Sequence, residues 1–198
     1  MRIGLFGGTF DPPHVGHLMI AQIASEAAQL DRVDFIPAAM PPHKLFQVMT
    51  DASVRLEMVR LAVTDFADFD VNPLECERPG PSYTVDTVRA YRERYPQDEL
   101  FLLLGEDMYN DFAQWKDAAL IAKEVTLIVA PRPEQSMQDM KRESPKHISN
   151  VKVIHLEMPA LDLSSSWLRK RLVAGLRVDP LLPREVAKWI AKTGVYNS

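Results

Sequence analysis

Two histidines, His14 and His17, are separated by two residues and follow the first apolar segment of the chain. Residues three apart on a helix share one face, so both imidazoles can point toward the same ligand. Imidazoles donate hydrogen bonds to phosphate oxygens, and they also bind zinc. A zinc site would need more ligands, and the only obvious candidates are Cys76 and His43, which counts against zinc. Phosphate binding and simple core packing both stay open on these residues alone.

A glycine pair and a threonine precede the histidines. Gly7 and Gly8 lack side chains, so the backbone could approach a phosphate or a ribose closely, although a tight turn would also use them. Thr9 could donate its hydroxyl to a phosphate or be an ordinary turn residue. We expect Asp11 to cap the following helix, whose apolar positions recur every four residues from Val15. The N–H groups at such a helix start favour phosphate.

A second group with affinity for phosphate lies near the C-terminal end. Arg169 follows three serines at positions 164–166. One serine is expected to cap the next helix, whose first N–H groups could meet phosphate oxygens. Arg169 lies one turn into that helix, and a guanidinium can hold two phosphate oxygens at once. The alternative is a solvated charged face shared with Lys170 and Arg171.

A proline pair precedes a basic residue in the first quarter of the chain. Pro41 and Pro42 are followed by His43 and Lys44. Two prolines fix the local backbone, so they would deliver the Lys44 ammonium to a phosphate at a defined reach. Because most lysines are solvated surface residues, an ordinary surface position is the competing interpretation.

Short apolar segments alternate with helical patterns along the whole chain. Predicted strands cover residues 2–6, 33–36, 69–72, 99–104, 125–130 and 151–156. Predicted helices begin near residue 15 and then cover 53–66, 84–95, 117–124, 164–174 and 183–192. This alternation predicts an α/β fold with a doubly wound, mainly parallel sheet. Ligands of such sheets bind beyond the carboxyl ends of the strands, where the glycine pair and the histidines would lie.

Length and composition predict one globular domain. The chain has 198 residues, with 46% apolar and 25% charged residues, which excludes a disordered chain and a coiled coil. We expect a single domain over residues 1–198, with residues 164–198 forming a closing helical segment. Residues 131–150, rich in proline and polar residues, are predicted to be a mobile surface connection.

Charge and cysteine content limit the partners. With 23 basic and 27 acidic residues the net charge is −4, which gives no support for nucleic-acid or membrane binding. No apolar run is long enough to span a bilayer, and we expect no signal peptide in the glycine-containing first ten residues. Cys76 is the single cysteine, so we expect no internal disulfide and a reducing, cytoplasmic location. The sequence leaves open whether the protein forms a homo-oligomer.

Several segments resemble the motifs of one enzyme family. They are GGTFDPPHVGH at 7–17, PAAMPPHK at 37–44, RLEM at 55–58, SYTVDT at 82–87, GED at 105–107 and SSSWLR at 164–169. Together they resemble the (T/H)-x-G-H nucleotidyltransferases and, more narrowly, the bacterial nicotinate-nucleotide adenylyltransferases. The resemblance covers essentially the whole chain and implies a Rossmann-like nucleotidyltransferase domain. Ser166 and Leu168 replace the threonine and isoleucine of the last motif, which are mild changes.

The resemblance implies adenylyl transfer from ATP to nicotinate mononucleotide, giving deamido-NAD and pyrophosphate in NAD biosynthesis. The residues that it implies for ATP binding are Gly7, Gly8, Thr9, His14, His17, Gly105, Asp107, Ser165, Ser166 and Arg169. The residues that it implies for nicotinate mononucleotide are His43, Lys44, Tyr83, Thr84 and Trp115. The implied catalytic groups are His14, His17, Lys44 and Arg169. Mg²⁺ would be carried by the ATP phosphates, because the sequence shows no carboxylate cage to hold it as a resident metal.

Two of these side chains, Trp115 and Asp107, and two further tryptophans also have structural interpretations. Trp115 could stack on the pyridine ring, with Tyr83 and Thr84 near the same ligand, or it could be a core aromatic. Asp107 could accept ribose hydroxyls or cap the next helix. We interpret Trp167 and Trp189 simply as packing residues.

Three other functions stay open. The same scaffold could use nicotinamide mononucleotide, phosphopantetheine or an alcohol phosphate as acceptor, although the 82–87 segment and Trp115 argue against this. A fragment of a class I aminoacyl-tRNA synthetase would share an H-x-G-H pattern, but this chain is short and acidic. A nucleotide-binding sensor without turnover would keep the fold, and the intact phosphate-contacting residues argue against it. A test for pyrophosphate release with ATP separates the sensor from an enzyme.

Overall fold

The strands form one six-stranded parallel sheet in the spatial order β3-β2-β1-β4-β5-β6. The computed structural model describes residues 1–41, 49–131, 151–159 and 161–196. The strands are β1 (Arg2–Gly8), β2 (Arg32–Pro37), β3 (Phe69–Val71), β4 (Glu99–Gly105), β5 (Val125–Ala130) and β6 (Val153–His155). Each corresponds to a strand predicted from the sequence, and the doubly wound parallel α/β fold is confirmed.

The helices follow the predicted alternation, with two short additions. They are α1 (Val15–Ala28), α2 (Ala52–Val63), α3 (Leu74–Glu77), α4 (Thr84–Arg94), α5 (Glu106–Asn110), α6 (Ala118–Glu124), α7 (Ser165–Val173) and α8 (Arg184–Thr193). Two 3₁₀ turns cover Phe112–Gln114 and Asp179–Leu181. The sequence did not predict α3 or α5, because helices this short show no apolar period.

The chain divides into two compact units. The first comprises residues 1–7, 20–34 and 83–162, and the second comprises residues 8–19, 35–82 and 163–198. Because β1, β2 and α1 each contribute residues to both units, the chain passes between them inside these elements. The single domain expected from the length stays a prediction.

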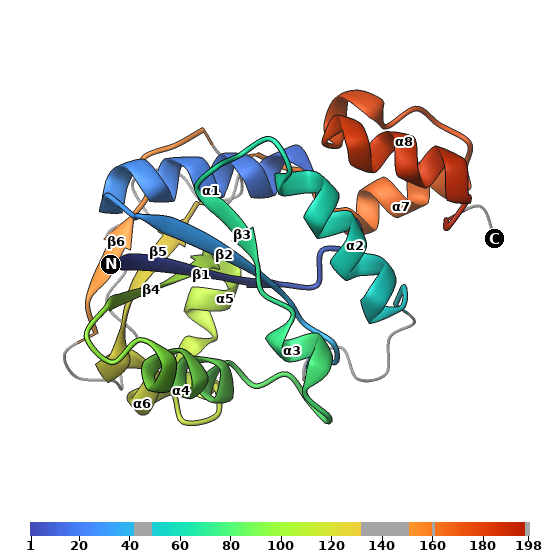
Figure 1. Ribbon diagram of the computed structural model, residues 1–198. Coiled ribbons are helices and arrows are strands. Elements are labelled where there is room, and N and C mark those ends of the chain that lie inside the picture. The colour runs from blue at the N-terminus through green and yellow to red at the C-terminus, as the bar shows by residue number, and fades with distance from the viewer. Residues whose placement is uncertain (42–48, 132–150, 160, 197–198) are drawn as a thin grey trace. The chain divides into compact units, whose positions relative to one another are not determined.

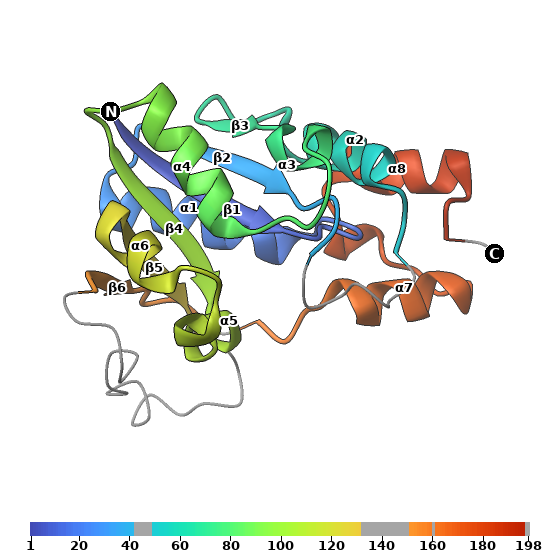
Figure 2. The same cartoon turned by 90° about the horizontal axis from the view of Figure 1, so that it is seen from below.

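In the first unit, helices cover both faces of the strands. β4 pairs with β1 and with β5, so that Leu102 lies beside Leu5 on one side and beside Leu127 on the other. Five consecutive residues of β4 are buried, as expected for a strand covered on both faces. α4 and α6 pack against each other on one face, and residues 20–28 of α1 lie on the opposite face (Figure 1, Figure 2).

The sheet order reverses between β1 and β4. β2 and β3 follow β1 in one direction, and β5 and β6 follow β4 in the other. In open α/β sheets ligands bind beyond the carboxyl ends of the strands at this switch point. Gly7 and Gly105 lie there, near the ends of their strands.

In the second unit, α2 packs against α8 and β3 (Figure 1). Phe35, Met58 and Ile190 are buried in this part of the core. Gly194 caps the C-terminal end of α8, and its φ of +65° is a conformation that glycine adopts at little cost. The chain then turns inward, so that Tyr196 is 5% exposed.

Two further sequence predictions concern the connection at residues 131–150 and membrane-spanning segments. Of the connection predicted to be mobile, all but its first residue lies outside the described residues. Within the part of the chain that the structure describes, no helix is both long and apolar enough to cross a membrane.

Candidate active site

The glycine pair ends β1 and does not form a tight turn, because the strand continues through Gly8. A Cβ on Gly8 would lie 2.8 Å from the ring of Phe10, so a larger residue would displace that ring. Phe10 has a left-handed φ of +50°, which costs an L residue roughly 1–2 kcal/mol. Its ring meets the His17 ring edge-on, with 4.9 Å between the centroids. A Cβ on Gly7 would meet no atom of the described residues, so the backbone there is open to close approach.

His14 and His17 stack on each other where α1 begins. Their ring centroids are 3.7 Å apart, with 26° between the planes. The main-chain N–H of His14 donates to Nδ1 of His17 at 3.1 Å. A neutral imidazole that accepts at Nδ1 carries its proton on Nε2, so His17 presents a donor there. The spacing of the two residues therefore brings the imidazoles together, although α1 begins one residue after His14.

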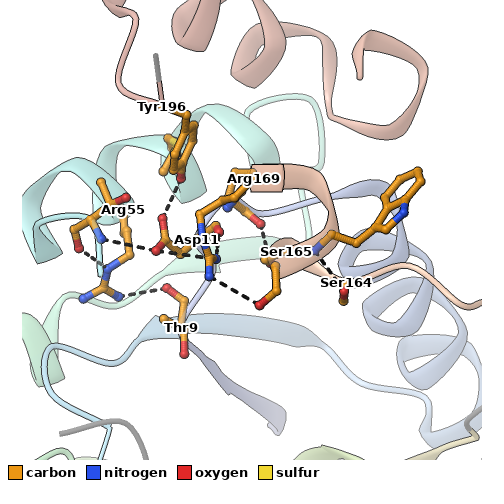
Figure 3. Close-up of polar contacts among 12 residues, drawn as sticks. Thr9, Asp11, Arg55, Ser164, Ser165, Arg169 and Tyr196 are labelled. Atoms are coloured by element: carbon orange, nitrogen blue, oxygen red, sulfur yellow. Dashed lines mark hydrogen bonds and ion pairs between the residues drawn. The ribbon is translucent and has the colours of Figure 1, made fainter. Parts of the chain in front are cut away.

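Residues 9–12 form a loop, which we call the 9–12 loop. Side chains elsewhere in the second unit donate hydrogen bonds to the main-chain carbonyl groups of this loop (Figure 3). Arg55, Arg169 and Ser165 donate to the main-chain oxygens of residues 9, 11 and 12 at 2.8, 2.5 and 2.8 Å, respectively. Two of these donors, Arg169 and Ser165, are residues that the sequence predicted for phosphate binding. Their positions tie the start of α7 to the loop that precedes the histidines.

Asp11 does not cap α1, and the prediction that it does so is wrong. The helix begins at Val15, too far along the chain for Asp11 to be its cap. The Asp11 carboxylate is buried and instead accepts from the Tyr196 hydroxyl at 2.6 Å and from the Thr50 N–H at 3.2 Å. Its Oδ2 also lies 3.7 Å from Nη1 of Arg169. Partners distant in the chain therefore replaced the local cap.

Arg55 is a buried cation that the sequence analysis did not assign to the site. Its Nε donates to the carbonyl of Thr50 at 2.8 Å, and its Nη1 donates to those of Thr9 and Ala38 at 2.8 and 2.7 Å. Its Nη2 donates to the carbonyl of Ala39 at 3.1 Å. One guanidinium thus joins the 9–12 loop to the chain after β2 and the chain before α2.

The buried environment of Arg55 changes the pKa of its guanidinium. Burial lowers the pKa of the Arg55 guanidinium, and the negative charge of Asp11 works against that shift. A sequence signal for this role existed, because Arg55 shares a helical face with the buried residues Met58 and Val59. A charged residue on an apolar helix face needs polar partners inside the protein.

The start of α7 confirms the predicted serine cap. Ser164 is the N-cap, and its hydroxyl accepts from the main-chain N–H of Trp167 at 3.2 Å. Nη2 of Arg169 donates to the Ser166 hydroxyl at 3.3 Å. The serines and the arginine of this motif therefore lie together against the 9–12 loop.

Trp167 is not the packing residue that we expected. It is 45% exposed, and the guanidinium of Arg171 lies over its ring, 5.0 Å from the centroid. Trp167 is two residues from both Ser165 and Arg169, which places it on the other side of α7 from the contacts with the 9–12 loop.

Three of the residues predicted for the acceptor, Tyr83, Thr84 and Trp115, lie in the first unit. The Lys116 ammonium lies over the ring of Tyr83, 4.3 Å from its centroid. Thr84 begins α4, directly after Tyr83. Trp115 packs on Phe112 with 5.5 Å between ring centroids, and it is only half-buried. A partly exposed ring can stack on a flat ligand, which a fully buried core tryptophan could not do.

Gly105 and Asp107 lie where β4 passes into α5. Gly105 is the N-cap residue, so the alternative that Asp107 caps this helix is excluded. Asp107 lies in the first turn and is exposed, which leaves its carboxylate accessible to hydroxyl groups of a ligand.

Two predicted residues, His43 and Lys44, lie outside the described residues. The other site residues are divided between the two units, and their assignments to ATP and to the acceptor stay predictions. Among the described residues, no group of three or more His, Cys, Asp or Glu side chains could hold a metal ion.

The fold and these motifs define a nucleotidyltransferase-like protein. The model of the cytidylyltransferase-like family matches residues 5–171. A solved Plasmodium falciparum structure, nicotinic acid mononucleotide adenylyltransferase complexed with NaAD, has a TM-score of 0.81 to this chain. It covers 99% of this chain and 97% of its own at 19% identity, which supports the fold.

Curated relatives show to which branch of this family the chain is similar in sequence. The Thermus thermophilus protein named "Probable nicotinate-nucleotide adenylyltransferase" is 44% identical over 197 residues, which is 100% of both chains. The Exiguobacterium sibiricum protein of the same name is 41% identical and covers 99% of each chain. The chain belongs to the cytidylyltransferase-like family and, within it, to the nicotinate-nucleotide adenylyltransferases.

Proposed function

We infer that this protein transfers the adenylyl group of ATP to nicotinate mononucleotide, which forms deamido-NAD and pyrophosphate. The observation that carries this inference is the end-to-end match, at 44% identity, to a relative named for that activity. The polar groups around the 9–12 loop support this inference, because they are suited to binding phosphate. Arg169 and Ser165 of α7 contact this loop just after β1 ends, and ligands of such sheets bind beyond the strand ends.

The reaction needs no nucleophile from the protein. The phosphate of the mononucleotide attacks the α-phosphorus of ATP in line, that bond forms as the bond to pyrophosphate breaks, and pyrophosphate leaves. Catalysis then consists of positioning and of stabilising the negative charge that develops on the phosphates. In this proposal His14, His17, Lys44 and Arg169 stabilise that charge, and Ser166 and Thr9 offer hydroxyl donors. The Ser165 hydroxyl donates to the Pro12 carbonyl, so Ser165 contributes through its main-chain N–H at the start of α7. Gly7 and Gly8 allow the phosphates to approach the backbone.

Three acceptor-binding residues come from the first unit. Trp115 stacks on the pyridine ring, and Tyr83 and Thr84 line the same place. His43 and Lys44, which lie outside the described residues, are the other two residues of this proposal. The half-buried Trp115 ring supports this proposal, because one side packs on Phe112 while part of it stays exposed. Gly105 and Asp107, at the end of β4, meet the ribose of ATP.

The metal enters with the substrate. ATP carries Mg²⁺ on its phosphates, and the described residues contain no cluster that would hold a resident ion in its place. A reducing, cytoplasmic location completes the proposal, because Cys76 is the single cysteine of the chain.

A comparison of two acceptors tests the proposed function. A pyridine carboxylate offers charged acceptors, whereas an amide also presents donors, and a mismatched buried polar group lowers transition-state binding. We expect kcat/KM for nicotinate mononucleotide to exceed that for nicotinamide mononucleotide by about tenfold or more. Equal kcat/KM values, or the reverse order, would contradict the proposal that nicotinate mononucleotide is the acceptor. Absence of pyrophosphate release with either acceptor would support a nucleotide-binding sensor instead.

A further inference from the structure

The guanidinium of Arg169 is fixed along one edge before substrate binds. Nη1 donates to the main-chain oxygen of Asp11 at 2.5 Å and lies 3.7 Å from Oδ2 of the same residue. The side chain of Arg169 is 32% exposed, so part of it faces solvent. A guanidinium has five N–H donors in a rigid fork, so one edge can be held while another meets phosphate oxygens.

The Asp11 carboxylate is itself held from both oxygens. Oδ1 accepts from the Tyr196 hydroxyl at 2.6 Å, and Oδ2 accepts from the Thr50 N–H at 3.2 Å and faces Arg169. Its side chain is 2% exposed. A buried carboxylate is costly unless hydrogen bonds and an opposite charge compensate it. The Asp11 carboxylate is therefore held between Tyr196 and Arg169 (Figure 3).

Tyr196 is too deeply buried to contact a substrate. Its hydroxyl lies between the Asp11 carboxylate and Sδ of Met58, which is 3.8 Å away. Burial, and after it the hydrogen bond to Asp11, raises the pKa of Tyr196, so the hydroxyl stays a neutral donor. Its hydroxyl donates to Asp11, and it also has a hydrogen bond with the side chain of Thr50.

We propose that Asp11 and Tyr196 are positioning residues that hold the Arg169 guanidinium ready for the phosphates. Asp11 supplies the carbonyl and the charge that orient Arg169, and Tyr196 fixes the Asp11 carboxylate. The proposal rests on the proposed function, in which Arg169 stabilises charge on the phosphates of ATP. A donor oriented in advance needs no reorganisation as charge develops, so its loss acts on kcat more than on substrate binding.

Tyr196→Phe tests the proposal with a matched control. Tyr91 also donates its hydroxyl to a buried carboxylate, that of Asp34 at 2.7 Å, but it does so in the first unit. Each Tyr→Phe change removes one hydroxyl and keeps the ring. We expect Tyr196→Phe to lower kcat about threefold to tenfold, the effect of one net hydrogen bond, with KM for ATP changed by less than about twofold. Tyr91→Phe should lower the melting temperature similarly and leave kcat unchanged.

A double-mutant cycle shows whether Tyr196 acts through Arg169. In an Arg169→Ala background, Tyr196→Phe should cause no further loss of kcat, because the group that it positions is gone. Full multiplication of the two losses would overturn the proposal, as would an unchanged kcat in Tyr196→Phe alone.

Asp11→Asn gives an independent variant in case Tyr196→Phe does not fold. It removes the charge that faces Arg169, and we expect kcat to fall about tenfold to a hundredfold, as for hydrogen bonds to charged groups. Normal kcat in folded Asp11→Asn would overturn the proposal. Lack of adenylyl transfer by the wild-type protein would overturn the proposed function and this inference with it, and that result is distinguishable because it precedes any variant.

Discussion

Different forces build the 9–12 loop and the aromatic surface formed by residues 83–84 and 115–116. Around the loop, buried charged groups hold the backbone, and Asp11 and Arg55 are each 1% exposed. On the aromatic surface, the half-buried ring of Trp115 packs on Phe112 and the exposed Lys116 covers Tyr83. The first region is rigid through polar contacts, and the second relies on ring packing near solvent.

This difference matches the two tasks of an adenylyl transfer. Charge develops on the phosphates during the reaction, and donors stabilise it best when they are fixed in advance. A pyridine ring carries the same shape and charge throughout, so its stacking partner binds ground and transition states alike. The comparison therefore predicts that changes in the first region act on kcat, whereas changes in the second act on KM.

The largest effect is expected from the cations and donors of the loop region. Arg169→Ala and His17→Ala should each lower kcat about 10²- to 10³-fold, because each removes a preorganised donor. Arg169→Lys should recover only part of the loss, since an ammonium lacks the two-pronged geometry. Steady-state kinetics with both substrates varied would measure these values.

Arg171→Ala is the matched control on the same helix. Arg171 packs on the exposed Trp167 and donates to the carbonyl of Arg177, on the other side of α7 from the loop contacts. Its removal should leave kcat within about twofold of the wild-type value. If Arg169→Ala retained normal kcat, or lost ATP affinity as much as kcat, the loop region would be a simple binding surface.

The next effect concerns stability in the same region. Arg55→Met removes the donors from four carbonyls, and we expect the free energy of unfolding to fall by about 3 kcal/mol. Arg60→Met on the exposed side of α2 should change it by less than about 0.5 kcal/mol. Urea denaturation of the three proteins gives the comparison, and equal stabilities of the two variants would show that Arg55 does not hold the loop.

A smaller effect is expected on the aromatic surface. Trp115→Ala should raise KM for the mononucleotide about tenfold and leave KM for ATP and kcat nearly unchanged, because stacking is uniform binding. Trp115→Phe keeps an aromatic ring and should recover part of the loss. If Trp115→Ala unfolded the protein, or weakened ATP binding as much as mononucleotide binding, Trp115 would be a core residue. The contrast between the two regions would then fail.

The smallest effect is a pH dependence in the loop region. Because the pKa of Tyr196 is raised above its ordinary value of 10.0, the folded protein keeps this proton when the unfolded chain loses it. The contribution of the Tyr196 hydroxyl to stability is therefore full below pH 10 and is lost as the pH rises further. The stability advantage of wild type over Tyr196→Phe should fall by up to about 1.4 kcal/mol per pH unit above about pH 10. A difference that stays constant across this range would contradict the buried hydrogen bond.

The sequence predicted the sheet and the helix starts that use local signals. The uninterrupted apolar runs of β4 and β5 and the serine cap of α7 depend on neighbours along the chain. The spacing of His14 and His17 predicted that their imidazoles would lie together, which they do although His14 lies one residue before α1. Such features are predictable because the residues that determine them are adjacent or one helical turn apart.

The buried polar cluster was not predictable in the same way. Asp11 has a side chain that is favoured at helix caps and precedes a helical pattern, but its partner Tyr196 lies 185 residues away along the chain. Only the fold brings the two together. Arg55 did carry a signal, a charge on an apolar helix face, but its carbonyl partners come from three separate segments.

The single-turnover rate of adenylyl transfer tests most directly whether the loop region acts on the chemical step. It would be measured at saturating ATP and nicotinate mononucleotide for the wild type, Arg169→Ala and Trp115→Ala, so that neither binding nor product release limits the rate. The Arg169→Ala rate should be about 10²- to 10³-fold lower, while the Trp115→Ala rate at saturation should match the wild type. Equal rates for wild type and Arg169→Ala, or a comparable loss in both variants, would contradict the division between a region that stabilises charge and a region that binds the acceptor.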